Sequence, residues 1–277
     1  MIFALELVAI GGLTGVLSGL LGVGGGFIMI PLLNAAGFLM REAAGSSLLY
    51  VAFTAASGTL RHVKLGTVDP VLALLLLSGA TPIAPVGSHY ATILPNEILQ
   101  IVFAFMVVGT AASYLRWGRS DRGESETPLQ GDELPRRRHI LLRRRRVGSE
   151  EILFSVNCFS ALAIGGCIGF ISGLLGVGGG WLLVPLLVLL MRTPLRIAVG
   201  TSLPGILLPA IVGAASHWRL GNLHLAASIP LILSGIVGAQ LGALLVVRIS
   251  HAWLEWLLII LLIVASAYML GRGFGLL

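Results

Sequence analysis

Long apolar runs with almost no charge are the feature of this sequence that most limits how it can fold. Val71–Leu77, Ile98–Val108 and Leu257–Ala265 each lie inside segments of about 20 residues, the length at which an α-helix crosses roughly 30 Å of hydrocarbon. Of the 277 residues, 56% are hydrophobic and only 11% are charged, whereas an ordinary soluble domain is about 25% charged. The sequence therefore predicts an all-α polytopic membrane protein.

The chain also repeats itself. Gly11–Leu33 and Gly165–Leu187 are identical at 15 of 23 positions, and Arg41–Leu48 aligns with Arg196–Leu203 when the register shifts by one residue. Membrane transporters are often built from such repeats, with the binding site at the repeat interface. The predicted division is a first transmembrane repeat at 1–117, a polar, arginine-rich, mobile linker at 118–150 and a second transmembrane repeat at 151–277.

The apolar pattern predicts two homologous four-helix halves. Eight long helices are expected near residues 2–21, 43–62, 70–90, 96–117, 152–174, 197–216, 222–247 and 252–271. Phe27–Leu39 and Trp181–Met191 are too short to span at about 1.5 Å per residue, and we expect glycine-broken, re-entrant half-helices there.

The distribution of Lys and Arg favours a cytoplasmic linker. With eight crossings, both termini are cytoplasmic too, and 14 Lys and Arg residues lie inside against 4 outside. If the short segments also cross, each half has five crossings, the halves are inverted, and the tally becomes 15 against 3. Charge counting leaves both topologies open.

Two glycine patterns overlap in each repeat. Glycines at every fourth position, as in Gly11, Gly15 and Gly19, predict close helix packing. The consecutive glycines that follow are poor helix formers, at about 1 kcal/mol each relative to Ala, and should open the helix. A half-helix that restarts there turns unpaired N–H groups and its positive dipole end toward the break, which attracts an anion; loops that serve only packing are the other interpretation. The candidate loop residues are Gly22, Gly24, Gly25, Gly26, Gly176, Gly178, Gly179 and Gly180.

Hydroxyl groups recur at matching places in the two repeats, at Ser46, Ser47, Thr201 and Ser202. Such groups donate to an anion without a buried countercharge, or bond their own backbone or a neighbouring helix. We interpret them, with the glycine loops, as candidate substrate-binding residues.

Two further matched pairs are candidates for a vestibule or a gate. Arg41 and Arg196 would draw anions toward an outer vestibule or anchor helix ends at the lipid headgroups. His62 and His217 would relay protons near pH 6–7 or lie at the cytoplasmic interface.

Several function classes lack the residues that they need. The helical halves hold no buried carboxylate cluster for Na⁺ or a metal, no nucleophile–base constellation and no ATP-binding motif, which predicts a secondary transporter without cofactor rather than an enzyme. The linker has no folded module to present nucleic acid, and its Arg136–Arg146 stretch is expected to contact anionic lipids. Association of several copies of the chain is left open.

The doubled glycine motif resembles that of a known family. GLLGVGGG occurs at 19–26 before Phe27 and at 173–180 before Trp181, and each copy is followed by Pro-Leu-Leu and by Gly-Ser/Thr-Ser-Leu. Outside 118–150, nearly the whole chain resembles the sulfite exporter TauE/SafE family. The resemblance implies a bacterial inner-membrane permease for a small anion such as sulfite, a sulfonate such as sulfoacetate, or a related organic anion. An anion channel and a membrane-embedded enzyme acting on a lipid phosphate are the alternatives.

Overall fold

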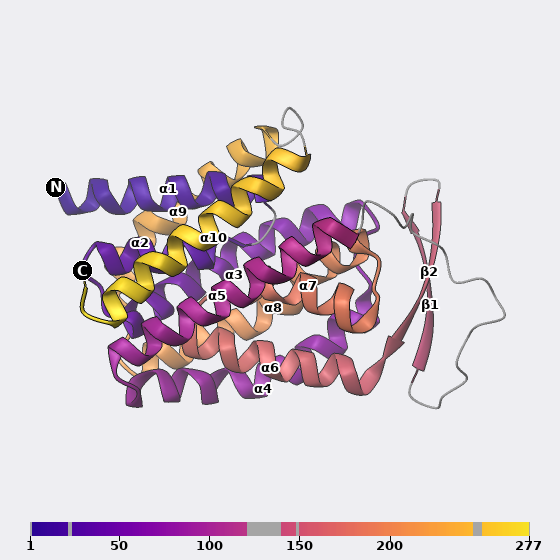
Figure 1. The fold of residues 1–277 in the computed structure, drawn as a ribbon, viewed down its shortest axis with the longest axis horizontal. Helices are drawn as coiled ribbons and strands as arrows, with labels where there is room; N and C mark the ends of the chain where they lie inside the picture. The colour runs from indigo at the N-terminus through magenta and orange to yellow at the C-terminus, as the bar shows by residue number, and fades with distance from the viewer. Residues whose placement is uncertain (1, 22–23, 121–139, 148–149, 246–250, 277) are drawn as a thin grey trace.

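The computed structural model describes residues 2–21, 24–120, 140–147, 150–245 and 251–276, which form ten helices and one β-hairpin (Figure 1). The helices are α1 (Ile2–Leu21), α2 (Gly26–Ala35), α3 (Met40–Lys64), α4 (Pro70–Ile93), α5 (Asn96–Ser120), α6 (Cys158–Leu175), α7 (Gly180–Met191), α8 (Leu195–Arg219), α9 (Leu225–Leu245) and α10 (His251–Gly273). The strands are β1 (Ile140–Val147) and β2 (Glu150–Asn157), paired antiparallel.

Six of the described helices are long and apolar enough to cross a membrane: α4, α5, α6, α8, α9 and α10. Their outward side chains include large apolar residues in the open, such as Leu74, Phe105 and Ile263, which a soluble protein would bury. The chain is therefore a multi-pass membrane protein. The two short helices α2 and α7 begin directly after the glycine loops, where the sequence predicted broken helices.

The described chain turns at two opposite ends of the bundle (Figure 1). The terminal end is the one at which the marked chain termini lie, and the hairpin end is the one at which the β-hairpin lies. At the terminal end, the Met40 amide donates to Asn96 Oδ1 at 2.7 Å, and Gly273 lies close to the start of α5. At the hairpin end, Arg145 of β1 reaches Asp69, which precedes α4. Both marked chain termini lie at the terminal end, away from the hairpin.

The helix directions follow from these ends. Helices α3 and α5 run from the terminal end to the hairpin end, and α8 and α10 run the opposite way, so the series α1–α5 and α6–α10 are antiparallel to one another. This disagrees with the eight-crossing topology, which put the linker and both termini on one side. It favours the alternative in which the two halves are inverted.

The predicted glycine stripes are helix contacts. Gly165, Gly169 and Gly173 on α6 lie against backbone carbonyl groups of α4, and Gly11 and Gly15 on α1 lie against α9, so that a Cβ at any of these positions would collide with backbone. Helices in lipid depend on such close approach because they gain little from leaving one apolar environment for another. The prediction of close packing is confirmed for these five glycines.

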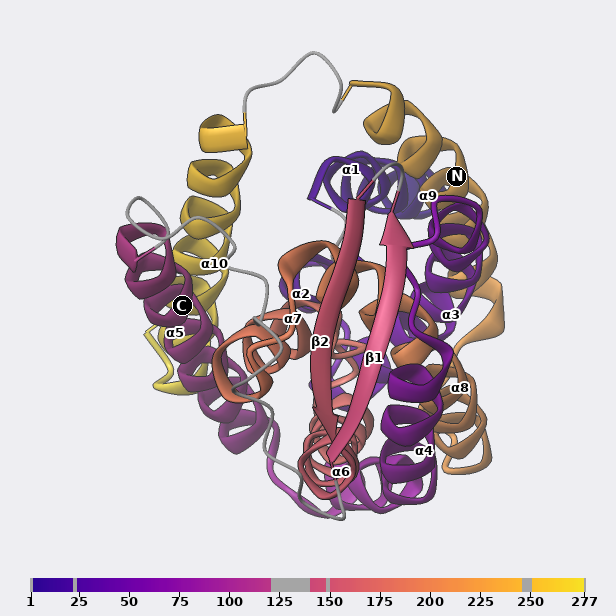
Figure 2. The ribbon, with the colours of Figure 1, turned by 90° about the vertical axis from the view of Figure 1, so that its right-hand side faces the viewer.

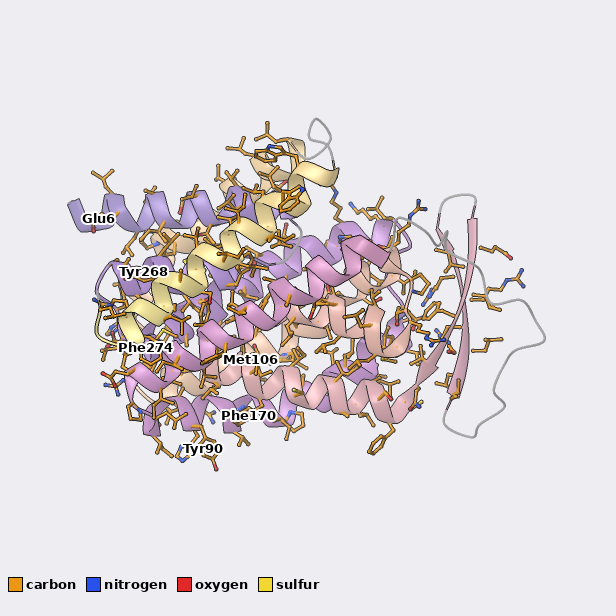
Figure 3. The ribbon with its side chains drawn as sticks, in the orientation of Figure 1. Glu6, Tyr90, Met106, Phe170, Tyr268 and Phe274 are labelled. Atoms are coloured by element: carbon orange, nitrogen blue, oxygen red, sulfur yellow. The ribbon has the colours of Figure 1, made fainter. Side chains whose placement is uncertain are left out.

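Aromatic rings close the outer rim of the α4–α6 contact. Tyr90 on α4 and Phe170 on α6 meet edge-on, with 6.0 Å between ring centroids (Figure 3). Edge-to-face pairs at this separation add to the energy of area burial. The α4–α6 contact is thus made by backbone approach along its length and by an aromatic pair near its terminal end.

The β-hairpin occupies residues that the sequence assigned to the linker and to a helix that starts at 152. Buried side chains alternate with less buried ones along strand β2. Phe154 and Val156 are 2% and 0% exposed and belong to the helical core. Helix α6 starts only at Cys158, because the Asn157 side chain caps it by accepting the amides of Phe159 and Ser160. The prediction of a helix from 152 is wrong, and the described residues 140–147 of the predicted linker form a strand.

The α4–α6 contact yields a stability prediction. A Cβ added by Gly169→Ala would collide with the Ala80 backbone, and overpacking of this kind costs about 1–3 kcal/mol. The melting temperature of the purified protein in detergent should therefore fall. Gly109→Ala is the matched control, since no atom lies within 4 Å of the new Cβ and Ala suits a helix better than Gly. Equal melting temperatures for the two variants would contradict this account of the contact.

Candidate functional site

The two glycine loops meet beside the middle of α3. A Cβ on Gly26 of the first loop would collide with the carbonyl of Val177 in the second, and the rings of Phe27 and Trp181 are 6.3 Å apart. Val51, halfway along α3, lies against both loops. The structure therefore brings together the starts of α2 and α7, the two half-helices of the sequence prediction.

The loop backbone requires glycine where each half-helix starts. Gly25 and Gly179 are the N-cap residues of α2 and α7, with φ of +74° and +79°, a region that other residues enter only with strain. Among the described residues, no hydrogen bond uses the amides of Gly26 and Phe27, the first two of α2. These N–H groups and the positive end of the helix dipole face the meeting point. Gly22 lies outside the described residues.

Helix α3 presents an unpaired hydroxyl to the loops. Ala44 contacts Gly176, Val51 contacts Gly178, and Ser47 lies between them on the same helix face by its spacing. The Ser47 side chain is fully buried, and its hydroxyl has no hydrogen-bond partner among the described residues. A buried unpaired hydroxyl costs free energy, so this position is suited to a polar ligand. The buried hydroxyl of Ser46 is likewise unpaired in the described structure.

The matching hydroxyls on α8 have structural partners. Thr201 Oγ1 accepts the Asp69 amide at 3.0 Å, and Ser202 Oγ donates to the Val199 carbonyl at 2.8 Å. Ile206, one turn after Ser202, contacts the first glycine loop. The two hydroxyl pairs therefore match in sequence but differ in bonding.

The candidate vestibule and gate residues do not gather at one place. Arg41 lies near the start of α3 at the terminal end, whereas Arg196 lies near the start of α8 at the hairpin end. His62 and His217 occupy opposite ends for the same reason, because each is near the end of its helix. The structure thus does not support an outer vestibule that both arginines share.

The two histidines also differ in environment. His62 Nδ1 lies 2.9 Å from the hydroxyl of Thr67 in the turn after α3. His217 is fully buried, and its Nε2 lies 2.8 Å from the Gly173 carbonyl of α6. Each therefore has a local structural contact.

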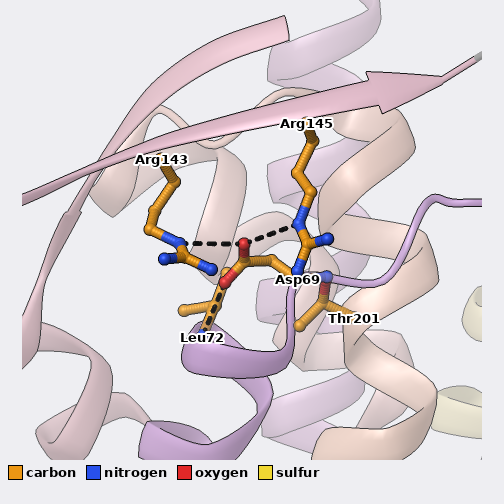
Figure 4. A network of polar contacts seen from close by, with 5 residues as sticks. All are labelled: Asp69, Leu72, Arg143, Arg145 and Thr201. Atoms are coloured by element: carbon orange, nitrogen blue, oxygen red, sulfur yellow. Dashed lines mark hydrogen bonds and ion pairs between the residues drawn. The ribbon is translucent and has the colours of Figure 1, made fainter.

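Asp69 connects several groups at the hairpin end by hydrogen bonds, and it was not among the candidate residues predicted from the sequence (Figure 4). Its buried carboxylate accepts the Leu72 amide at 2.8 Å, Arg143 Nε at 3.1 Å and Arg145 Nε at 3.0 Å, while its own amide donates to Thr201. Burial alone would raise the pKa of Asp69, but the Leu72 amide and the two guanidinium groups outweigh it and hold the pKa below its usual value. The carboxylate is therefore ionised at neutral pH. An Asp followed by Pro at a helix start indicates a helix cap, so this role of Asp69 could have been predicted from the sequence.

Two cavities lie away from the glycine loops. One of about 490 Å³ at the terminal end is lined by Phe38, Glu42 and His224, with His224 Nε2 3.4 Å from a Glu42 oxygen. The other, of about 480 Å³, is an apolar groove between α3 and α8 lined by residues such as Phe53 and Trp218. Neither of these two cavities is lined by a glycine-loop residue.

Apolar spanning helices around two broken helices, with an unpaired polar group where the breaks meet, are typical of membrane transporters. The family model described as "Sulfite exporter TauE/SafE" matches residues 7–269. The chain belongs to this family, as the sequence resemblance indicated, and the family is one of membrane transporters rather than enzymes.

Relatives carry the same class of description. The "Probable membrane transporter protein YunE" of Bacillus subtilis (strain 168) is 26% identical over 275 residues, which cover 96% of this chain and 97% of that protein. A "Probable membrane transporter protein" of Xylella fastidiosa (strain Temecula1 / ATCC 700964) is 28% identical over 268 residues, or 96% of this chain and 88% of its own length. No protein of known structure matches the chain.

The Thr201–Asp69 contact gives a prediction about stability. Thr201→Val keeps the shape of the side chain but leaves the buried Asp69 amide without its acceptor, which costs about 1–3 kcal/mol. Thermal unfolding in detergent should show a lower midpoint. Thr110→Val is the matched control, because this buried hydroxyl only donates to a carbonyl of its own helix, that of Met106. A Thr201→Val midpoint no lower than that of the control would argue against the structural role.

Proposed function

We propose that the protein is a secondary transporter of a small anion, either sulfite, a sulfonate such as sulfoacetate, or a related organic anion. The unpaired, buried hydroxyl of Ser47 beside the starts of α2 and α7 carries this proposal. Two half-helix starts and a hydroxyl supply hydrogen-bond donors and positive dipole ends, and they require no buried countercharge. The description of the family as sulfite exporters supports the same solute class.

The antiparallel series suggest how access would alternate. Helix α2 returns from the glycine loops to the terminal end, and α7 returns to the hairpin end. In inverted-repeat transporters, related half-helices on opposite sides of a central site take turns in closing it. We place the anion between the amides of Gly26 and Phe27, the matching start of α7 and the Ser47 hydroxyl.

We place the hairpin end in the cytoplasm of a bacterial cell and the termini on the outer side of the inner membrane. With inverted halves, the sequence assigns 15 Lys and Arg residues to the linker's side of the membrane and 3 to the other side, in accord with the positive-inside rule. The Arg136–Arg146 stretch then faces the leaflet that holds anionic lipids.

Transport kinetics test the substrate site. In proteoliposomes, uptake of labelled sulfite should saturate, and Ser47→Ala should raise KM by about 10-fold or more, the effect of one lost hydrogen bond to a charged group. Its melting temperature should stay close to that of wild type because no partner is lost. Ser88→Ala is the matched control, since this serine is equally buried but its hydroxyl bonds the Ala84 carbonyl of its own helix.

The outcomes separate the parts of the proposal. Wild-type kinetics in Ser47→Ala would remove Ser47 from the site while leaving the transporter intact. Flux that rises linearly with sulfite concentration would indicate a channel. The absence of saturable transport for sulfite, sulfoacetate and related anions would contradict the proposed solute class.

Thiol labelling tests the orientation. After Cys158→Ser and Cys167→Ala remove the native thiols, a membrane-impermeant reagent should label Leu276→Cys in intact cells and spare Ser125→Cys. Inverted vesicles should give the reverse result. Labelling of both positions from one side would contradict the inverted arrangement of the halves.

A further inference from the structure

The docked hairpin holds two arginines against the helical bundle. Arg143 and Arg145 alternate with Arg144 along β1, and their side chains are 27% and 28% exposed, against 70% for Arg144. Arg143 pairs across the hairpin with Phe154, which is buried in the helical core. Figure 2 shows the hairpin lying across this end of the bundle, so the two inward arginines lie between the strands and the helices.

The guanidinium groups of Arg143 and Arg145 use only part of their hydrogen-bonding capacity in contacts with the described residues. Both donate to one oxygen, Asp69 Oδ2, through Nε at 3.1 and 3.0 Å. A guanidinium has five N–H donors, and the hydrogen bonds that the described residues make with Arg143 and Arg145 involve Nε alone. Among the described residues, two positive charges share one carboxylate, so this cluster retains a net charge of +1 and has N–H donors that no described residue accepts.

We propose that Arg143 and Arg145 form an oxyanion-binding site at the hairpin end, which receives the transported anion outside the glycine-loop site. This inference rests on the proposed function for the identity of the solute. Planar guanidinium groups bind the oxygens of sulfite, sulfonate or phosphate through paired N–H donors. The Asp69 carboxylate holds both groups in place through Nε, and no described residue accepts their remaining N–H donors.

The cluster also adjoins the central site. The Asp69 amide bonds Thr201, and the next residue, Ser202, lies one turn from Ile206 at the first glycine loop. Helix α8 therefore runs from the arginine cluster directly to the half-helix starts. An anion bound at the cluster would lie beside the same helix that contacts the first glycine loop.

An oxyanion at this place has two sources, a free solute or a lipid headgroup. The geometry favours the free solute, because the inward arginines are covered by the strands while Arg144, the exposed one, is paired with Glu151. A lipid phosphate carries two acyl chains and needs an open approach. A small anion does not.

A dye on the hairpin would report binding locally. Leu142 is 48% exposed and lies two residues from Arg144 on the outward face, so Leu142→Cys, in protein without Cys158 and Cys167, accepts an environment-sensitive fluorophore. The full chain in lipid-free detergent is titrated with sulfite in oxygen-free buffer, with chloride replacing it at constant ionic strength. We expect a saturable signal, weakened about 10-fold or more by Arg143→Gln or Arg145→Gln and unchanged by Arg144→Gln.

The result that overturns the site is an equal sulfite affinity in all three glutamine variants. If a glutamine variant does not fold, Arg143→Lys keeps the charge and loses the planar fork; about 10-fold weaker binding supports the site, and wild-type affinity overturns it. A signal that appears only with phosphatidylglycerol in nanodiscs, and never with free sulfite, also overturns the solute site. Saturable transport without a hairpin signal would contradict this inference alone, whereas a hairpin signal without transport would contradict only the proposed function.

Discussion

Close backbone contact between helices is the constraint on which the rest of this structure depends. In a bilayer a helix gains no hydrophobic energy by leaving lipid for another helix, so association depends on how closely two backbones approach. Glycines remove the Cβ atoms along α6 and α1, and the carbonyl groups of α4 and α9 occupy that space. The same absence of side chains lets the two glycine loops touch, which brings the starts of α2 and α7 to one place.

The helices were predictable because one property, sustained hydropathy over about 20 residues, determines them in a membrane. Glycine spacing likewise revealed the contact stripes and the starts of α2 and α7. The hairpin was not predictable in this way. Strand β2 combines apolar and polar residues in a run too short to separate from a helix start by pattern alone, and β1 is a row of arginines that resembles a solvated linker.

The candidate site likewise has a part that local sequence predicted and a part that it did not. Local sequence predicted the glycine loops, and the repeated Gly-Ser/Thr-Ser-Leu segment made Ser47 a candidate residue. Sequence could not show that Thr201 bonds a backbone amide from a residue 132 positions earlier, nor that Arg143 and Arg145 meet Asp69. Matching residues in two repeats suggest equal roles, but their neighbours differ, and hydrogen bonding follows the neighbours.

The pairing of helices has a consequence for how the molecule would move. The most extensive contacts join α4 to α6 and α1 to α9, so each tightly packed pair takes one helix from each half of the sequence. Glycine contacts of this kind resist sliding because backbone atoms, not flexible side chains, fill the interface. Bodies that shift past one another during a transport cycle would therefore each combine helices from both halves of the sequence. Neither half of the gene would encode a complete moving part, and separate halves would have to be produced together to recover one.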